Sequence, residues 1–497
     1  MFKSLFRQLA AMALALCLSG LGSAQPVPPP DLVPREFRAA WVATVSNIDW
    51  PSSRNRTTAQ QQAELIAILD TLKNAGLNAA ILQIRPECDA LYPSTIEPWS
   101  HWLTGQQGRA PNPIWDPLQF AIDAAHARNM ELHAWMNPYR ARNPTAYTIH
   151  STHIIAERPD LVRDYGTRKI LDPGEPEVPA YLLSVVRDVI ERYDVDGIHF
   201  DDYFYPYPET GLTFPDQATY QRYLDGGGSL SLANWRRKNV SDFIRDCHAM
   251  IKEVKPGVKF GLSPFGIWRP GNPPGVTGLD AHNAIYGDSK LWLNSGWVDY
   301  FTPQLYWSIS PPQQSYTALL DWWISQNTRG RHIWPGLGLY RIGQTSYGGG
   351  LVTEITDQIA ATRLRPGATG NVFFSMSQLS DNTLGSRGLI AAEYASRALI
   401  PASTWLDNVP PAAPTLSTTA GGGGTTLEWS TAGADPLFAF VVYIYRQGAW
   451  EYQILPATAG SFLITGAAPE FATVTAVDRL GNESLPGVPP LDVWMVR

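Results

Sequence analysis

The chain has 497 residues, of which 44% are hydrophobic and 17% charged, and its formal net charge is −7. This length exceeds what one small hydrophobic core needs, so we expect two domains. The acidic balance and the lack of a long basic run argue against a nucleic-acid partner. The 18 Trp and 21 Tyr residues are many for this length. Such rings usually fill a core, but they also stack on the flat faces of sugars.

The first 24 residues have the pattern of a secretory signal peptide. A positively charged start precedes an apolar run over 9–18, and small residues at 22–24 suit cleavage before Gln25. The run is too short to span a membrane. A bulky residue precedes Cys17, where lipoprotein signals carry a small one, so we expect no lipid anchor. We therefore predict a secreted or periplasmic protein.

The next segment, 25–34, is a proline-rich linker. Between 35 and 400, eight short apolar runs alternate with amphipathic stretches of helical spacing. The predicted strands are 37–44, 79–84, 131–137, 197–201, 259–264, 299–306, 333–339 and 371–376. The predicted helices are 58–75, 118–128, 180–193, 235–254, 315–327 and 351–363. This alternation predicts an α/β fold, a (β/α)8 TIM barrel.

Three connections of this predicted barrel are long, at 138–179, 203–233 and 265–291. They follow the third, fourth and fifth strands, at the C-terminal face where such barrels build their clefts. We therefore expect the substrate cleft among these loops.

A second boundary lies near Pro410, Pro411 and Pro414. The segment 409–497 shows short strands with turn signals, at 425–429, 439–446, 461–465 and 472–478, and no helical period. This pattern predicts a small all-β, immunoglobulin-like sandwich. The stretch 474–484 resembles the penultimate strand and turn of a fibronectin type III domain.

The run 196–206 is an apolar strand that ends in two carboxylates and several aromatic rings. If Ile198 and Phe200 face the helices, His199 and Asp201 face the barrel interior. Inward residues at the C-terminal end of a barrel strand face the active-site mouth. Asp201 is therefore the first catalytic candidate. Asp202 points the other way if the strand stays regular. It is a second catalytic candidate, with a role as an orienting residue or as a metal or loop ligand as the alternative.

Several segments resemble the bacterial glycosyl hydrolase-like family ten, and they occur in the same order. They are 35–44, 47–51, 83–86, 89–94, 133–140, 171–174, 196–206 and 303–307. The resemblance implies a TIM barrel that is distantly similar to alpha-amylase-type glycosidases. It also implies a substrate among the glycans of the cell envelope, peptidoglycan included.

Most glycosidases need two carboxylates, one as acid and one as nucleophile or base. Asp201 occupies a position similar to that of the nucleophile on the corresponding strand of alpha-amylase-type barrels. Alpha-amylase-type enzymes carry their catalytic acid after the fifth strand, whereas the fifth strand of this chain ends without an acidic residue. Asp89 and Asp172 lie in family-like segments and are candidates for the second carboxylate, with structural roles as the alternative.

Polar and aromatic residues at strand ends suit sugar hydroxyls and ring faces. The substrate-binding candidates are Trp41, Gln83, Arg85, His133, Trp135, Asn137, Tyr139, Arg140, His199, Tyr203, Gln304, Tyr306 and Trp307. His133 and His199 also raise a metal-dependent hydrolase as an alternative. Without a His-x-His on the first strand we expect neither metal nor cofactor.

The leading hypothesis is an exported glycoside hydrolase that cleaves a cell-envelope polysaccharide, with peptidoglycan glycan strands among the candidates. A glycan-binding barrel without catalysis is the alternative. In either case the C-terminal domain would serve as a spacer or as a docking module on the envelope. Cys88 and Cys247 remain in the mature chain, either paired or free and buried.

Overall fold

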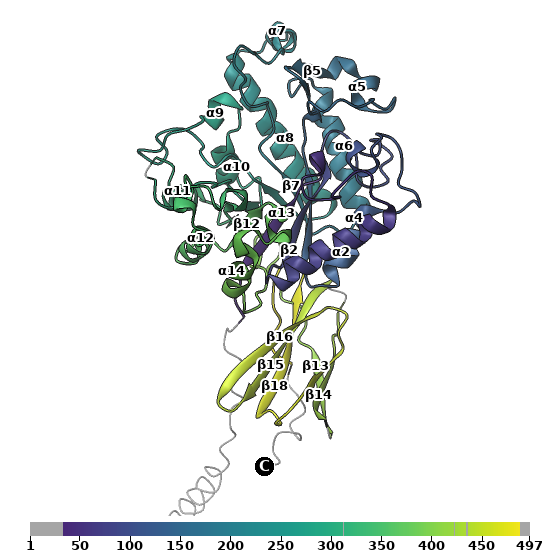
Figure 1. The fold of residues 1–497 in the computed structure, drawn as a ribbon, viewed down its shortest axis with the longest axis vertical. Coiled ribbons are helices and arrows are strands. Elements are labelled where there is room, and N and C mark those ends of the chain that lie inside the picture. The colour runs from purple at the N-terminus through teal and green to yellow at the C-terminus, as the bar shows by residue number, and fades with distance from the viewer. Residues whose placement is uncertain (1–32, 312, 422, 434–435, 488–497) are drawn as a thin grey trace, which may run out of the picture.

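The computed structural model describes residues 33–487 except 312, 422, 434 and 435. The predicted signal peptide, the expected start at Gln25 and nearly all of the predicted linker lie outside these residues. Figure 1 shows two domains end to end, a large α/β domain and a smaller yellow all-β domain below it. In the described part of the chain, no helix is long and apolar enough to span a bilayer.

The large domain is a closed barrel of parallel strands, as predicted. Its sheet has the order β10-β9-β8-β7-β3-β2-β1-β12-β11. Because β10 pairs with β9 and β11 pairs with β12, these two short strands are the halves of one barrel strand and close the sheet. The strands are β1 Phe37–Val42, β2 Ala79–Arg85, β3 Glu131–Met136, β7 Gly197–Phe200, β8 Lys259–Leu262, β9 Tyr300–Phe301, β10 His332–Ile333, β11 Gly336–Gly338 and β12 Gly370–Phe374.

Helices surround this barrel, and the six predicted ones are confirmed within a few residues. The first begins with a capping box between Thr57 and Gln60, and Leu65, Leu69 and Leu72 on its inner face are buried against the strands. Two further short helices, Ser289–Ser295 and Ser386–Glu393, were not predicted. The helices are α2 Thr58–Asn74, α4 Pro117–His126, α6 Glu177–Arg192, α8 Leu232–Val254, α10 Ser289–Ser295, α11 Tyr316–Gln326, α12 Glu354–Arg363 and α14 Ser386–Glu393.

Two hydrophobic clusters fill the barrel domain, one outside the sheet and one inside. Ile198 and Phe200 belong to the outer cluster beneath the helices, as predicted. Aromatic rings fill the interior: Phe37 stacks on Trp334 at 3.7 Å between ring centroids, and Trp334 stacks on Tyr300 at 4.8 Å. A packed interior leaves the strand ends as the place for a cleft.

Extra elements gather on the C-terminal face, where the long connections were predicted. The connection after β3 folds into a small antiparallel sheet of order β4-β6-β5. Figure 1 shows β5, α5 and α7 at the end of the molecule opposite the all-β domain. These elements are β4 Arg140–Arg142, β5 Val162–Tyr165, β6 Arg168–Leu171, α3 His101–Thr104, α5 Ile154–Glu157, α7 Gln217–Asp225, α9 Ala281–Ala284 and α13 Met376–Ser380.

Two antiparallel sheets, β13-β14-β17 and β16-β15-β18, form the C-terminal sandwich. Their facing side chains share one core, which contains Trp429 from one sheet and Phe440 from the other. The four predicted strands are confirmed, whereas β13 and β16 were missed. The fibronectin type III assignment stays a prediction. The strands are β13 Thr415–Gly421, β14 Gly424–Ser430, β15 Leu437–Arg446, β16 Ala449–Pro456, β17 Ser461–Ile464 and β18 Phe471–Asp478.

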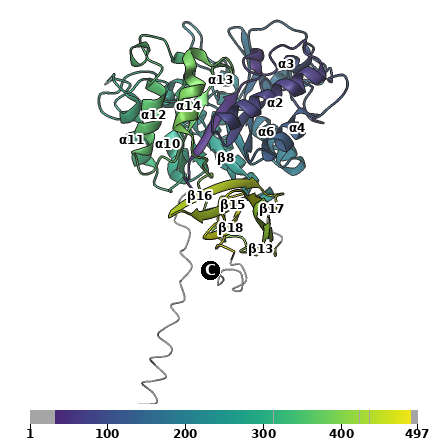
Figure 2. The ribbon, with the colours of Figure 1, turned by 60° about the horizontal axis from the view of Figure 1, so that its bottom comes forward.

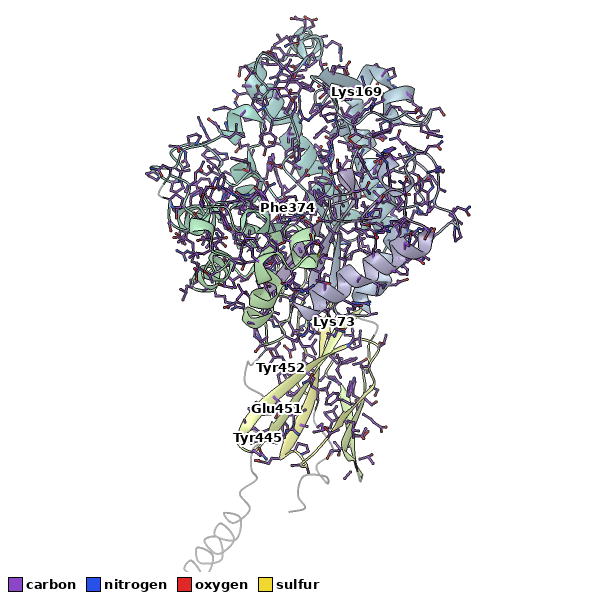
Figure 3. All side chains as sticks on the ribbon, in the orientation of Figure 1. Lys73, Lys169, Phe374, Tyr445, Glu451 and Tyr452 are labelled. Atoms are coloured by element: carbon purple, nitrogen blue, oxygen red, sulfur yellow. The ribbon has the colours of Figure 1, made fainter. Side chains whose placement is uncertain are left out.

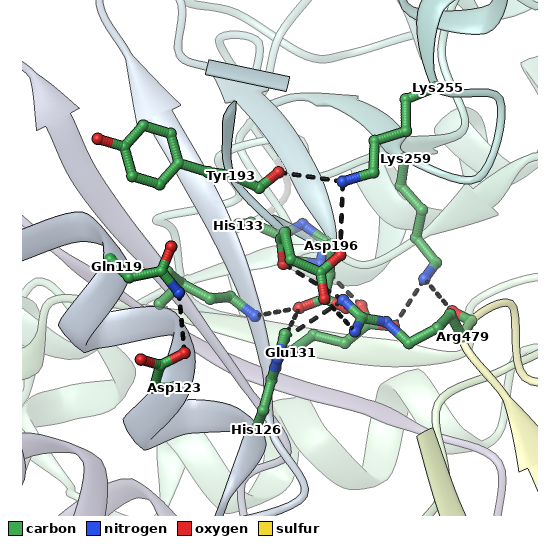
Figure 4. Close-up of polar contacts among 12 residues, drawn as sticks. Gln119, Asp123, His126, Glu131, His133, Tyr193, Asp196, Lys255, Lys259 and Arg479 are labelled. Carbon is green, nitrogen blue, oxygen red and sulfur yellow. Dashed lines mark hydrogen bonds and ion pairs between the residues drawn. The ribbon is translucent and has the colours of Figure 1, made fainter. Parts of the chain in front are cut away.

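The sandwich docks on the N-terminal face of the barrel, which we call the base (Figure 2). Arg479 extends from the turn after β18 to Asp196, 2.5 Å away, and to Asp194, 2.9 Å away. His126 contacts the other oxygen of Asp196 at 2.9 Å, and Lys259 donates to the main-chain oxygen of Arg479 at 3.1 Å. Figure 4 shows this cluster of charges between the two domains. The domains therefore share a charged interface.

Candidate active site

Asp201 and Asp202 lie side by side in one cavity at the C-terminal face of the barrel. The cavity has a volume of about 360 Å³, and both carboxylates line it. We expected Asp202 to point the other way. That expectation is wrong because β7 ends at Phe200, so the alternation of side chains stops before either acid.

The walls of this cavity are largely aromatic, contributed by loops and strand ends around the whole barrel. The rings of Tyr306 and Phe374 stack at 5.9 Å, and the edge of Trp41 meets Phe374 at 6.1 Å. The lining aromatic residues are Trp41, Trp135, Tyr203, Tyr207, Phe265, Tyr306, Tyr340 and Phe374. Flat apolar faces around polar groups are what a sugar ring requires.

Asp201 accepts hydrogen bonds from residues of the neighbouring strand. One oxygen accepts from the indole N–H of Trp135 at 3.2 Å and from the side-chain amide of Asn137. The other oxygen accepts from the main-chain N–H of Tyr203 at 3.4 Å. Only 4% of Asp201 is exposed. The carboxylate is thereby fixed in position with its remaining surface toward the cavity.

Asn137 is itself held by two further predicted residues. Its side-chain oxygen accepts hydrogen bonds from Gln83 and Arg140. Gln83 in turn accepts from the main-chain N–H groups of Thr44 and Val45, at 2.9 and 2.8 Å. This network ties the ends of β1, β2, β3 and β7 together beneath the acids.

Asp202 has its own pair of donors. One oxygen accepts from the side-chain amide of Gln304 at 3.0 Å, and the other accepts from the hydroxyl of Tyr207. Gln304 also donates to the main-chain oxygen of Ser263 at 2.9 Å, which fixes its orientation. Neither carboxylate forms an ion pair with any described residue, and Arg140 contacts the ring of Tyr203 and the oxygen of Asn137 instead.

Burial raises the pKa of both acids. Burial raises the pKa of Asp201 to about 7; Arg140 opposes this rise, and the neighbouring charge of Asp202 adds to it. Burial likewise raises the pKa of Asp202, against the hydrogen bonds from Tyr207 and Gln304. Two neighbouring carboxylates in a low-dielectric site do not both ionise readily, so ionisation of one opposes ionisation of the other.

The other two catalytic candidates lie away from this cavity. Asp89 is fully buried in the loop after β2 and accepts from main-chain N–H groups and from Gln107 at 3.2 Å. Asp172 accepts from Thr219 at 2.7 Å and pairs with Arg163 at 3.0 Å. Each of these two carboxylates holds separate loop segments together through its hydrogen bonds. Burial and the neighbouring Glu87 raise the pKa of Asp89 to about 7, so a raised pKa alone does not mark the site.

His133 and His199 lie below the cavity and share the hydroxyl of Tyr300. Trp41 donates its indole N–H to Nε2 of His199 at 3.1 Å, so the proton of that ring is on Nδ1, 3.1 Å from the Tyr300 oxygen. Tyr300 then donates to Nδ1 of His133 at 2.7 Å, and Nε2 of His133 donates to Glu131 at 2.8 Å. Burial holds the pKa of His199 far below its usual value.

Three further substrate-binding candidates do not line the cavity and instead contact other parts of the fold. Arg85 forms a buried ion pair with Glu97 at 2.6 Å. The ring of Tyr139 packs edge-on against Phe243 in the outer core. Trp307 packs against Phe265 beside the cavity without lining it. Their positions at strand ends placed them near the site, but their side chains point elsewhere.

Several lining residues were not predicted: Ala43, Val45, Ile48, Tyr207, Ser263, Phe265, Tyr340 and Phe374. Tyr207 belongs to the aromatic run after β7, and Phe374 is the last residue of β12. Both positions carried a signal, because residues at these strand ends face the mouth of the barrel. Tyr340 lies in a single turn of 3-10 helix, Leu339–Arg341, where the pattern contains no such signal.

The arrangement can donate and accept a proton in a cavity that excludes much of the solvent. Within the described ranges, no group of three or more His, Cys, Asp or Glu is placed to hold a metal ion. Cys88 and Cys247 are both free and buried. Among the residues that line the cavity, Asp201 and Asp202 are the only carboxylates.

Comparisons with known proteins agree with this geometry. The family model described as Glycosyl hydrolase-like 10 matches residues 36–348. Glycosyl hydrolase YngK of Bacillus subtilis is 37% identical over 472 residues, which cover 90% of this chain and 92% of that protein. Glycosyl hydrolase DigH of Escherichia coli K12 is 37% identical over 418 residues, covering 75% of this chain and 92% of that protein.

Among solved structures, the catalytic domain of β-amylase from Paenibacillus polymyxa has a TM-score of 0.44 at 15% identity. The match covers 73% of this chain and 99% of that one. The family model spans more than half of the 497 residues, and both relatives align along most of their length. The chain therefore belongs to the glycosyl hydrolase-like 10 family.

Proposed function

We propose that the protein hydrolyses O-glycosidic bonds in a cell-envelope polysaccharide, with peptidoglycan glycan strands as the substrate. The observation that carries this proposal is the pair Asp201 and Asp202, buried without a cation partner in an aromatic cavity. Asp201, whose pKa of about 7 keeps it partly protonated near neutral pH, delivers its proton to the leaving oxygen. Export rests on the signal-like pattern of residues 1–24.

The adjacency of the two acids favours a sugar that supplies its own nucleophile. Acid and nucleophile carboxylates normally flank the scissile bond, about 5–9.5 Å apart. Here both carboxylates follow one strand, and no other carboxylate lines the cavity. Substrate-assisted glycosidases meet this condition with the oxygen of a 2-acetamido group, which attacks the anomeric carbon as the leaving oxygen takes the proton. Asp202 would then orient that group, and water would open the intermediate with Asp201 as base.

The test uses purified peptidoglycan glycan strands, with and without stem peptides, and mass analysis of the products. Wild-type protein is expected to release shorter oligosaccharides, and Asp201→Asn is expected to reduce the rate by at least about 10³-fold, since it removes the acid. Strands whose sugars have lost their acetyl groups are expected to resist cleavage. Cleavage of those strands at an unchanged rate would exclude the acetamido nucleophile.

An absence of any product from wild-type protein, together with tight binding of the strands, would favour the alternative of a non-catalytic glycan-binding barrel. Folding of Asp201→Asn is checked by circular dichroism, so that lost activity is not confused with lost structure. Retention of a tenth of the wild-type rate by this variant would remove Asp201 from the chemistry.

A further inference from the structure

A second cavity, larger than the active-site cavity, lies where the sandwich meets the base of the barrel. Its volume is about 580 Å³. Its walls come from the end of α2 and the residues after it, the loop between α4 and β3, residues 395–398 and strand β16. We call it the interdomain cleft. Figure 3 shows Lys73 at the foot of the barrel, with Tyr452 and Glu451 on the sheet below it.

The barrel side of the interdomain cleft carries three cations, Lys73, Arg128 and Arg397. Arg128 pairs with Asp70 at 2.7 Å, and Arg397 donates to the main-chain oxygen of Lys73 at 2.6 Å. Within the described ranges, no carboxylate forms an ion pair with Lys73. The cleft therefore has a net positive charge, which suits an anionic ligand.

A single carboxylate, Glu451, lines the cleft opposite these cations. It pairs with Arg446 at 2.8 Å, and 47% of its side chain is exposed. Its charge is thus largely compensated from outside the cleft. It reduces the positive potential of the cleft without cancelling it.

The sandwich side presents aromatic rings and an open strand edge. Trp450 and Tyr452 on β16 both line the cleft and are half-buried. Strand β16 is the edge of its sheet, so its outer main-chain groups have no strand partner. One of them, the oxygen of Ile454, accepts from the side-chain amide of Asn129 at 3.3 Å. Residues two apart share a direction, so the main chain of Tyr452 faces the same way.

We propose that the interdomain cleft binds a carboxylate-bearing polysaccharide strand, the same class of polymer that the active site cuts. The three cations meet the carboxylates, the rings of Trp450 and Tyr452 meet sugar faces, and the strand edge meets hydroxyl groups. The cleft lies at the opposite end of the barrel from the catalytic acids. It therefore holds the polymer without taking part in the reaction. This inference rests on the proposed function for the identity of the polymer.

The test measures binding by isothermal titration in the full chain carrying Asp201→Asn, which stops turnover. The probe is peptidoglycan glycan strands freed of stem peptides, whose muramic acid carries a carboxylate. Lys73→Glu is expected to raise Kd at least fivefold at low salt, and less at high salt because the charges are screened. Glu451→Gln is expected to lower Kd about twofold. Lys238→Glu, an exposed charge reversal on α8, is the matched control and is expected to change nothing.

An unchanged Kd for Lys73→Glu would overturn the proposal. So would equally tight binding of strands whose carboxylates have been reduced to alcohols. A polyglutamate peptide that displaces the strands with equal affinity would show that the cleft takes an acidic peptide instead. Hydrolysis of short soluble oligosaccharides by Lys73→Glu with intact Asp201 is expected to match wild type. If wild type hydrolyses nothing, the proposed function fails, and the titrations still decide whether the cleft binds glycan.

Discussion

The mouth and the base of the barrel each bury an aspartate to the same extent, but the pKa values of the two carboxyls shift in opposite directions. Asp201 at the mouth and Asp196 at the base are each 4% exposed. Burial raises the pKa of Asp201 to about 7. The pKa of Asp196 is far below its usual value, because Arg479 and His126 compensate for its desolvation. Burial sets the cost of the charge, and the partner decides whether that cost is met.

The two ends therefore contribute to stability with opposite signs. A carboxyl with a lowered pKa stabilises the fold above its unfolded pKa, and that contribution is lost as the pH falls through the folded pKa. A carboxyl with a raised pKa binds its proton more tightly in the folded state. Ionising it destabilises the fold as the pH rises from about 4 to about 7. The base stabilises the fold with charge, whereas the mouth holds destabilising carboxylates that are suited to chemistry.

Arg479→Met is the strongest way to break this contrast. It removes the cation that pairs with Asp194 and Asp196 and is expected to lower the free energy of unfolding by about 3 kcal/mol, measured by urea denaturation at pH 7. The kcat/KM at 20 °C is expected to stay within about threefold of wild type, because Arg479 lies at the far end of the barrel. A stable but inactive variant would show that the base acts on the mouth directly.

Much of the barrel could be predicted from sequence because its strands are short apolar runs between helical periods. The runs at 299–306 and 333–339 are shorter as strands than predicted. Pro303 interrupts the first, and Pro335 divides the second into β10 and β11, since proline has no N–H for the ladder. The missed strand β13 consists mostly of exposed small and polar residues, which weaken the alternation signal. Strand β16 does alternate apolar and polar residues from Trp450 to Ile454 and was overlooked.

The site was predictable only as far as local chain geometry reaches. Asp201 follows from the end of β7, but the direction of Asp202 depends on where that strand stops. The link from His199 to Tyr300 joins positions 101 residues apart. The pair between Asp196 and Arg479 joins positions 283 apart, in different domains. No period or motif in the sequence contains such pairings, so tertiary packing alone establishes them.

Asp202→Asn sharpens the contrast through the pH dependence of the reaction. The charge of Asp202 helps to raise the pKa of Asp201, so its removal is expected to lower that pKa by about one unit. If protonated Asp201 is the acid, kcat/KM falls as the pH rises past its pKa. The alkaline limb of the profile then moves to lower pH, which costs a further tenfold in rate at pH 8. The measurement is kcat/KM from pH 5 to 9.

A lower plateau alone would be uninformative for Asp202→Asn, because this residue also orients the substrate in the proposed mechanism. The position of the alkaline limb is the deciding quantity. A limb that stays in place would mean that the two carboxylates titrate independently. It would also contradict the effect of the Asp202 charge on the pKa of Asp201.

Asp201→Asn is expected to cause the smallest change, an increase in the free energy of unfolding. The sign of this change distinguishes the acid at the mouth from the acid at the base. At pH 8 the folded protein must hold Asp201 ionised against burial, and the neutral amide removes that cost, so the variant is expected to be more stable by about 1–2 kcal/mol. At pH 4 the carboxyl is protonated in the folded state, and the advantage disappears. Subtracting the two urea-derived values cancels pH-independent changes in hydrogen bonding to Trp135 and Asn137. Asp196→Asn is the matched control, and its loss of stability is expected to be nearly the same at pH 8 and at pH 4, because the folded pKa of Asp196 lies below both. Equal signs for the two variants at pH 8 would mean that burial, and not the ion partner, decides the state of both acids.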